Sequence, residues 1–259
     1  MLFKGIEGIK AIKAWQRLHR RTAWRPVVSD SDGPAGASKF SGTPWLARGE
    51  SWPKCGCCRH DMNLVLQLDL AQVPKELRGD FGPGLLQFFS CLPMGRGCDG
   101  FFGQESRTRV LRVVKGKSGG KGKIQIPSNQ SAPKSLVGWK PIVDDPKQDD
   151  RRMLGFRATS SKAKRYVDIS MPDAYVLRFP EKELDRLWSN DRNDKLFGWP
   201  AWEQGNVWPY CPRCWRRMDL VFQIASYDNV PYYWGDVGRG HIMQCPIHKD
   251  QLNFEWACG

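Results

Sequence analysis

Apolar and polar residues alternate in two pairs of short segments, a pattern typical of half-buried β-strands. The first strands of the pairs are MNLVLQLDL from Met62 and MDLVFQIAS from Met218, and the second strands are LLQFFSC from Leu85 and HIMQC from His241. A Gly-Asp-x-Gly-x-Gly turn separates the two strands of each pair. Because a strand and not a helix follows this turn, we interpret it as a structural turn and not as a phosphate-binding loop.

Two segments have helical patterns. FPEKELDRLW from Phe179 has a proline and acidic residues in its first turn, which predicts a short helix. Between Ile9 and Arg21, a helical projection separates basic from apolar residues, which predicts a basic amphipathic helix. The basic side comprises Lys10, Lys13, Arg17, Arg20 and Arg21, and the apolar side comprises Ile9, Ile12, Trp15 and Leu18.

The paired segments belong to a longer internal similarity. Shifting the chain by 156 residues brings identical residues together, including Trp52 with Trp208, Cys55 with Cys211 and Cys58 with Cys214. The Gly-Asp-x-Gly-x-Gly turns match at the same offset, Gly79 falling on Gly235. We therefore predict that one unit of about fifty residues occurs twice and that residues 42–90 and 198–246 superpose.

From these patterns we expect an α+β, β-rich fold of two pseudo-symmetric lobes that arose by internal duplication. Each lobe would contain a small antiparallel sheet and a zinc knuckle. The predicted divisions are a basic N-terminal arm (1–41), a first repeat lobe (42–105), a basic Gly/Lys-rich linker or insert (106–165), and a short helix with the second repeat lobe (166–259).

The second unit contains a strong metal-binding pattern. Cys211 and Cys214 form a Cys-x-x-Cys pair, and Cys245 and His248 form a Cys-x-x-His pair. Two such knuckles can present four ligands tetrahedrally to zinc, and no position remains for a catalytic water. We therefore expect a structural zinc site. A redox role for Cys-x-x-Cys would need a helix N-terminus, but a strand pattern follows.

The first unit matches this pattern only in part. Cys55 and Cys58 align with the second knuckle, but counting from Gln87 and Gln244 places Phe88 at Cys245 and Cys91 at His248. Cys98 is then the natural fourth ligand, and Cys57 and His60 are less suitable because they crowd the first knuckle. A second zinc, a metal-free lobe and a set of free thiols remain open alternatives.

Charge and cysteine content point to the class of partner and to the compartment. The formal charge of +13 is concentrated in the N-terminal arm and in the segment from Arg107 to Lys123. A concentrated basic surface favours nucleic acid or an acidic protein as the partner. The candidate contacts are Lys10, Lys13, Arg17, Arg20 and Arg21 of the arm together with Lys115, Lys117, Lys121 and Lys123. Nine cysteines, two of them adjacent, suit a reducing compartment better than a secreted disulfide framework.

The second half carries the motifs GWPAWEQGNVWPYCPRCWRRMDLVFQI, YYWGDVGRGHIMQCPIH and FEWACG. In these it resembles the YwqG-like family of uncharacterised proteins in its zinc-knuckle form, over about residues 40–105 and 165–259. More distantly, the chain is similar to the programmed-cell-death-protein-2 family in its Gly-x-Pro-x-Trp entrance, its knuckle and its LLQ strand. The first resemblance implies a duplicated β-rich fold without established catalysis, and the second implies a chaperone-like role toward a ribosomal protein.

The leading functional hypothesis is a non-catalytic, zinc-stabilised module that binds a protein or ribonucleoprotein. The alternatives are an RNA-binding protein that uses the basic arm and loop, a toxin-immunity or defence protein, and an enzyme with Asp80 and Asp236 in a cleft between the lobes. No apolar run is long enough to span a membrane. We expect a soluble, cytoplasmic protein, with a mitochondrial location as the alternative that the basic helix suggests.

Overall fold

The computed structural model describes most of the chain. The described residues are 2–4, 6–91, 98, 106–115, 126–128, 130–146, 157–160, 166–170, 176–180, 191–205 and 207–259. The helical elements are α1 (Ile6–Leu18) and the short 3-10 helices η1 (Lys75–Leu77) and η2 (Ser106–Thr108). The strands are β1 (Leu2–Lys4), β2 (Arg21–Ser29), β3 (Lys39–Phe40), β4 (Asn63–Asp69), β5 (Leu85–Ser90), β6 (Arg109–Val114), β7 (Lys134–Asp144), β8 (Arg157–Ser160), β9 (Tyr166–Ser170), β10 (Val176–Pro180), β11 (Lys195–Leu196), β12 (Asp219–Ala225), β13 (Arg239–Gln244) and β14 (Leu252–Ala257).

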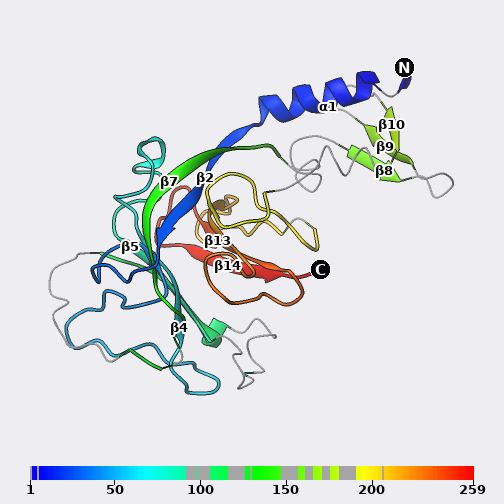
Figure 1. Ribbon diagram of the computed structural model, residues 1–259. Helices are drawn as coiled ribbons and strands as arrows, with labels where there is room; N and C mark the ends of the chain where they lie inside the picture. The colour runs from blue at the N-terminus through cyan, green and yellow to red at the C-terminus, as the bar shows by residue number, and fades with distance from the viewer. Residues whose placement is uncertain are drawn as a thin grey trace.

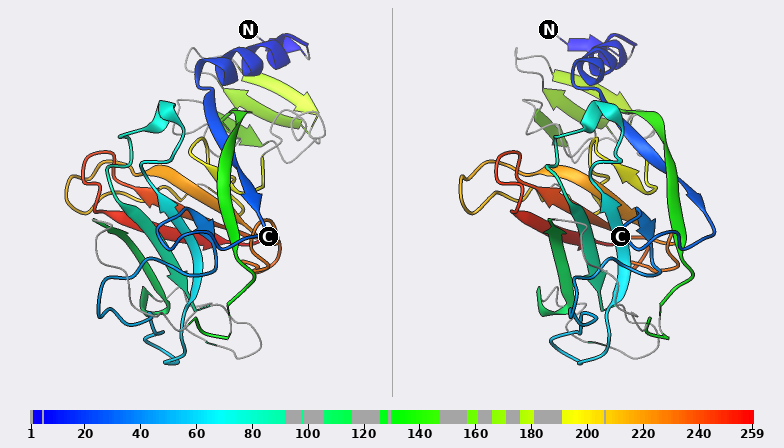
Figure 2. Two further views of the ribbon diagram at one scale, coloured as in Figure 1. Left: turned by 60° about the vertical axis from the view of Figure 1, so that its left-hand side comes forward. Right: turned by 90° about the vertical axis from the view of Figure 1, so that its left-hand side faces the viewer.

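Ten strands form one antiparallel sheet in the order β14-β13-β12-β11-β2-β7-β3-β4-β5-β6. The sheet is so strongly curved that its two outer strands, β6 and β14, contact each other (Figures 1 and 2). The guanidinium of Arg109 on β6 lies 5.4 Å from the ring centroid of Phe254 on β14. A nearly closed sheet leaves little unpaired edge, which is where sheets otherwise risk pairing with other chains.

The expectation of an α+β fold with two lobes is therefore wrong, because the chain is nearly all β and its halves share one sheet and one core. We call β3 to β6 the first half and β11 to β14 the second half. The ring of Phe88 on β5 packs 4.3 Å, centroid to centroid, from that of Phe254 on β14, and Phe40 packs against Phe222 at 5.9 Å. Each half-sheet has an apolar face whose exposure to water would be unfavourable, and the two halves bury these faces against each other.

The strands β2 and β7 join the halves at the centre of the sheet. They pair along almost their whole length, Arg21 lying opposite Asp144 and Ser29 opposite Ser135 (Figure 1). Both strands lie outside the two units that the internal similarity predicts. Most of their residues are partly or fully exposed, and Pro26 and Pro141 interrupt any strand pattern. The sequence pattern therefore does not predict these two strands, although they join the two halves into one sheet.

The N-terminal helix ends earlier than its sequence pattern predicts. α1 stops at Leu18, and Arg21 already begins β2. Trp15 is buried, whereas Leu18, which the projection places on the apolar side, is 82% exposed. Beside α1 lies a second sheet in the order β1-β10-β9-β8 (Figure 1). The helix predicted from Phe179 begins within strand β10, and the rest of it lies outside the described residues.

The two halves use the same buried polar contacts. The side-chain oxygen of Gln67 accepts a hydrogen bond from the backbone N–H of Trp45, and Gln223 accepts one from Ala201, 22 residues earlier in each case. The amide nitrogen of each glutamine donates to two backbone carbonyls. Buried amides are stable only when they are hydrogen-bonded, so these contacts fix the β3–β4 and β11–β12 connections in the same way.

Candidate metal centres

Each Cys-x-x-Cys segment folds into a tight hairpin that places both thiols on one side. The N–H of Cys55 donates to the carbonyl of His60, and the N–H of Cys211 donates to that of Arg216, both at 2.8 Å. The residue after the second cysteine has a positive φ in both hairpins. This left-handed residue turns the chain back, so that it can enter β4 or β12 directly.

The end of the next strand completes each site. In the first half Gln67 pairs with Gln87, whereas in the second half Gln223 pairs with His241. Cys91 therefore takes the position of Cys245, four residues after the paired residue. The count from Gln87 and Gln244, which placed Cys91 at His248, is wrong by three residues. It took Gln244 as the partner of Gln87, and it missed that the loop before the second strand is shorter in the second half. The matched glycine turns lie out of register for the same reason.

In the second half, Cys211, Cys214, Cys245 and His248 come together with their ligand atoms within 4.8 Å of one another. The sulfurs of Cys214 and Cys245 are 3.5 Å apart, and Nδ1 of His248 lies 3.5 Å from Cys211 Sγ and 3.8 Å from Cys245 Sγ. A tetrahedral zinc with metal–sulfur bonds of about 2.3 Å has sulfur–sulfur edges of about 3.8 Å. The four ligands thus already have tetrahedral spacing.

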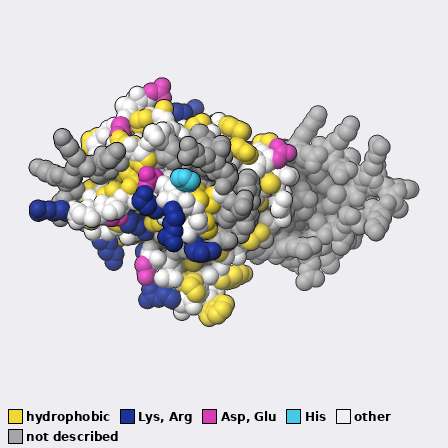
Figure 3. Space-filling model, turned by 90° about the horizontal axis from the view of Figure 1, so that it is seen from below, with side chains coloured by type: hydrophobic (Ala, Val, Ile, Leu, Met, Phe, Trp, Pro, Cys, Tyr) yellow, Lys and Arg dark blue, Asp and Glu magenta, His cyan; other side chains and the backbone are white. Residues whose placement is uncertain are grey.

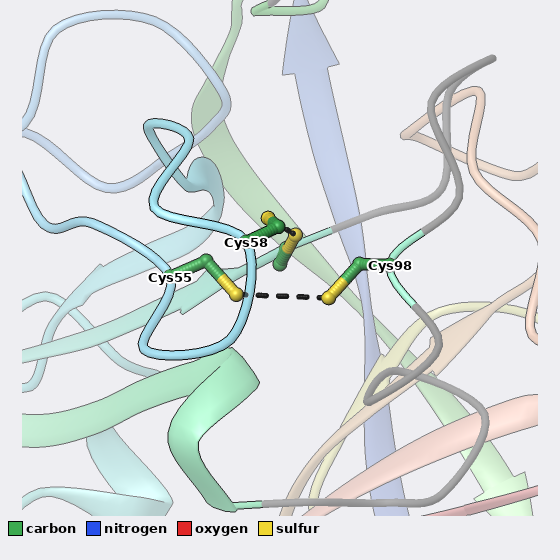
Figure 4. Close-up of side chains that lie close together, drawn as sticks. Cys55, Cys58 and Cys98 are labelled. Atoms are coloured by element: carbon green, nitrogen blue, oxygen red, sulfur yellow. Dashed lines mark hydrogen bonds between the residues drawn. The ribbon is translucent and has the colours of Figure 1, made fainter.

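In the first half, Cys55, Cys58, Cys91 and Cys98 form a second group with the same spacing (Figure 4). The sulfurs of Cys55 and Cys98 are 3.7 Å apart, and those of Cys58 and Cys91 are 3.5 Å apart. These distances exceed the roughly 2.05 Å of a disulfide and match the edges of a metal tetrahedron. Both groups could hold a metal ion. Cys57 is exposed and belongs to neither group.

Hydrogen bonds and burial shift the thiol pKa values in opposite directions within the first group. Burial would raise the pKa of Cys55, but the backbone N–H groups of Cys58 and Cys57 outweigh it and lower that pKa to about 7. Burial raises the pKa values of Cys91 and Cys98. In the second group, N–H donors from His248 and Ile247 outweigh burial and lower the pKa of Cys245. A divalent cation bound there would stabilise the thiolate form of every cysteine in the two groups.

The two groups lie in different apolar surroundings. Leu46, Met62, Leu64 and Phe89 surround the first group, and one tryptophan, Trp52, packs edge-on against Phe89. Three tryptophans surround the second, Trp199, Trp202 and Trp208. Trp208 packs edge-on against Trp199 and Trp202, and the guanidinium of Arg217 lies 4.4 Å from its ring centroid.

Sequence patterns missed a pair of buried lysines that stand at the same 156-residue offset. Lys195 is fully buried and pairs at 2.8 Å with Asp144, which is also fully buried and accepts from the N–H of Trp199. Lys39 is equally buried and pairs at 2.7 Å with Asp32, whose side chain is 31% exposed. Asp144 is the last residue of β7 and Asp32 lies shortly after β2, so each ion pair ties a central strand or the loop after it to one half of the sheet. The shared offset was the signal that could have revealed them.

The predicted basic contacts are dispersed. Lys10, Lys13 and Arg17 are exposed on α1. Arg20 pairs with Asp145 at 2.8 Å, and Arg21 lies 3.9 Å from the ring centroid of Trp199, so both already have partners within the chain.

Of the predicted basic residues in the central loop, Lys115 is exposed, whereas Lys117, Lys121 and Lys123 lie outside the described residues. Lys and Arg side chains also gather beside a histidine on the face of the molecule shown in Figure 3.

The residues of the enzyme alternative do not share one site among the described residues. Asp80 lines a cavity of about 260 Å³ beside the second group, and the amine of Lys249 donates to the backbone carbonyl of Asp80. The backbone carbonyl of Asp236 instead accepts from Gly259 at the C-terminus. His241 is fully buried, and burial, reinforced by the charges of Lys195 and Arg239, lowers its pKa to about 3. A histidine so far from solvent is unsuited to general base catalysis near neutral pH.

No helix in the described part of the chain is long and apolar enough to cross a membrane. No curated protein matches the chain significantly. Over residues 38–257 the chain matches a family described as a domain of unknown function, DUF1963. The match begins after α1 and β2 and includes both cysteine groups. The chain therefore belongs to the DUF1963 family.

Proposed function

We propose that this protein is a non-catalytic binding module, stabilised by two structural zinc ions, that engages a protein or ribonucleoprotein partner. The observation that supports this proposal is the presence of two groups of four ligand atoms with tetrahedral spacing. Four thiolates, or three thiolates and an imidazole, are the ligand sets that favour zinc in structural sites. Because the protein supplies all four ligands at each group, a bound zinc would have no open position for substrate or water.

The positions of the two groups support a structural role. Each group joins the hairpin before one strand to the loop after its neighbour, namely β4 with β5 and β12 with β13. A zinc ion there would close the outer end of each strand pair. Metal binding in such knuckles is worth on the order of 10 kcal/mol, which is comparable to the whole net stability of a domain.

We further propose that the two halves arose by duplication, as the YwqG-like resemblance implies. The shared offset of Lys39 with Lys195 and of Gln67 with Gln223, together with equivalent hydrogen bonds, supports this origin. The fourth ligand then differs, Cys98 in one half and His248 in the other, because tetrahedral geometry can be completed by either residue type.

Metal analysis of the purified protein tests the zinc proposal. We expect two equivalents of zinc per chain, and about one in each of the variants Cys55→Ser and Cys211→Ser, because one ligand set is broken in each. Cys57→Ser is the matched control, since it removes an exposed thiol beside the first group without removing a ligand. Less than one equivalent in the wild type, or an unchanged metal content in Cys211→Ser, would contradict the proposal.

A further inference from the structure

The hairpin of the second metal group displays a tryptophan in an unfavourable position. Trp215 follows Cys214, has φ of 56° and is 79% exposed. A positive φ is uncommon for bulky residues, and an exposed indole loses the stabilisation that burial would give it. Glycine would suit this backbone better. Neither the local turn nor the core explains why a tryptophan stands here.

Other exposed apolar side chains surround the same metal group. Val207 and Tyr210 precede Cys211 and are 54% and 60% exposed. Ile247 stands between the ligands Cys245 and His248 and is 51% exposed. Because the four ligand atoms lie within 4.8 Å of one another, these side chains are gathered at one end of the sheet.

The same hairpin is basic. Arg213 and Arg216 stand on either side of Cys214 and Trp215, and both arginines are exposed. Arg217 is held against the ring of Trp208. Arg213 pairs at 2.9 Å with Asp250, but both side chains are more than half exposed, so an anionic ligand can replace this contact at low cost. The first hairpin has Arg59 where the second has Trp215, so it offers no aromatic ring at this position.

We propose that this hairpin surface binds single-stranded nucleic acid. A base would stack on the exposed ring of Trp215 while Arg213 and Arg216 contact the neighbouring phosphates. An aromatic face flanked by arginines is the arrangement that binds single strands without sequence preference. The proposal rests on the zinc proposal, because a metal at Cys211 and Cys214 would hold the hairpin that displays the ring.

Positive charge on both sides of one flat ring favours nucleic acid over a protein partner for this surface. A protein interface centred on a tryptophan is usually enclosed by further contacts that exclude water. Here Trp215 stands on the hairpin turn, and the next residue, Arg216, is charged and exposed.

The test is fluorescence anisotropy of the zinc-loaded full chain with labelled 12-nucleotide oligo-uridine and oligo-thymidine, and with a 12-base-pair duplex. We expect both single strands to bind more tightly than the duplex. Trp215→Gly should weaken binding about tenfold or more without lowering thermal stability, because one stacked base is lost while the backbone strain is relieved. Trp215→Phe should retain most of the affinity. Arg216→Ala should reduce the salt slope by about 0.7, the value for one phosphate of a single strand.

Tyr227 provides a matched control. It too is an exposed aromatic residue with a positive φ, 57°, but it follows β12, whereas Trp215 precedes it. The seven residues of β12, which span roughly 23 Å, lie between the two positions. Tyr227→Gly should therefore leave affinity unchanged. An equal loss in both glycine variants would overturn the assignment of the site.

Binding of oligo-uridine but not oligo-thymidine, or the reverse, would identify RNA or DNA as the ligand and support the proposal. An absence of binding at 50 mM salt by protein that contains two zinc ions would overturn this inference and leave the zinc proposal standing. Protein that contains no zinc would overturn the zinc proposal instead. Unchanged oligonucleotide affinity in Trp215→Gly, with loss of a copurifying protein, would overturn the inference in favour of a protein partner.

Discussion

The two metal groups are alike in the hairpins that present their ligands and different in what surrounds them. Both begin with a Cys-x-x-Cys hairpin followed by a residue with positive φ, and both end after the neighbouring strand. The first is completed by Cys98, seven residues after Cys91, and the second by His248, three residues after Cys245. The residues at the hairpin tips also differ, Arg59 in one and Trp215 in the other. The same ligand geometry in both halves suits a shared structural role, and the different surfaces are the reason that we propose partner binding for the second half only.

Breaking either metal group should have the largest effect on stability. We expect Cys55→Ser and Cys211→Ser each to lower the free energy of unfolding by several kcal/mol, since zinc binding contributes on the order of 10 kcal/mol per site. Because the halves share one core, each variant should unfold in a single transition. Circular dichroism recorded during heating measures this. Two separate transitions, with one half remaining folded, would contradict the shared core.

Breaking the two buried ion pairs should have the second-largest effect on stability, and the effect should differ between the halves. Lys195→Met would leave Asp144 buried without its cation and should cost about 3–5 kcal/mol. Lys39→Met should cost less, because water can solvate the partly exposed Asp32 once its cation is gone, whereas Asp144 is fully buried. Urea denaturation measures both. The double variant Lys195→Met/Asp144→Asn removes both charges and keeps an acceptor for Trp199, so it should recover much of the loss. An equal loss in free energy of unfolding in Lys195→Met and Lys39→Met would show that the two ion pairs contribute equally to stability and would contradict this prediction.

His241 should make stability depend on pH, whereas its counterpart Gln87 should not. Burial lowers the folded-state pKa of His241 to about 3, while an unfolded histidine titrates near 6.5. Between these values the unfolded chain binds more protons, so stability falls as the pH falls, by at most about 1.4 kcal/mol per unit from this residue.

His241→Gln should flatten this dependence. The new amide could bond to the backbone at Ala201, as Gln87 bonds to the carbonyl of Trp45. Denaturation at pH 4, 5, 6 and 7 tests the prediction. Asp194 has its pKa raised to about 7, chiefly by burial, and acts in the opposite direction. It is present in both proteins, so the difference between them isolates His241. Parallel pH profiles for the two proteins would show that His241 is not the cause.

Surface acids beside the two hairpins should have the smallest effect. Asp61 pairs with Lys54 at 3.0 Å, and Asp250 pairs with Arg213 at 2.9 Å, with much of each pair exposed. Asp61→Asn and Asp250→Asn should therefore leave the melting temperature nearly unchanged. If the second hairpin binds nucleic acid, Asp250→Asn should tighten oligo-uridine binding and Asp61→Asn should not. Equal effects on binding would mean that general charge, and not the second hairpin, controls it.

Local patterns were sufficient for the elements that have a strong periodicity or spacing. The alternation from Met62 and from Met218 predicted β4 and β12, and the spacing of Cys211, Cys214, Cys245 and His248 predicted a group that the structure brings together. Strand alternation and metal-ligand spacing are short-range properties, so a single sequence carries them.

Long-range pairing could only be decided by the tertiary structure. β2 and β7 are more than a hundred residues apart in the sequence. They pair with each other, and β2 also pairs with β11 of the second half while β7 also pairs with β3 of the first half. Their exposure and their prolines, Pro26 and Pro141, removed the apolar alternation by which a strand is recognised. Sequence spacing already named Cys91 and Cys98 as candidate ligands of the first group, but only the pairing of Gln67 with Gln87 shows that Cys91 takes the position of Cys245. The sequence thus determined the local strands and the ligand chemistry. Burial of two apolar half-sheets against each other, which depends on contacts between distant residues, decided that they form one nearly closed sheet.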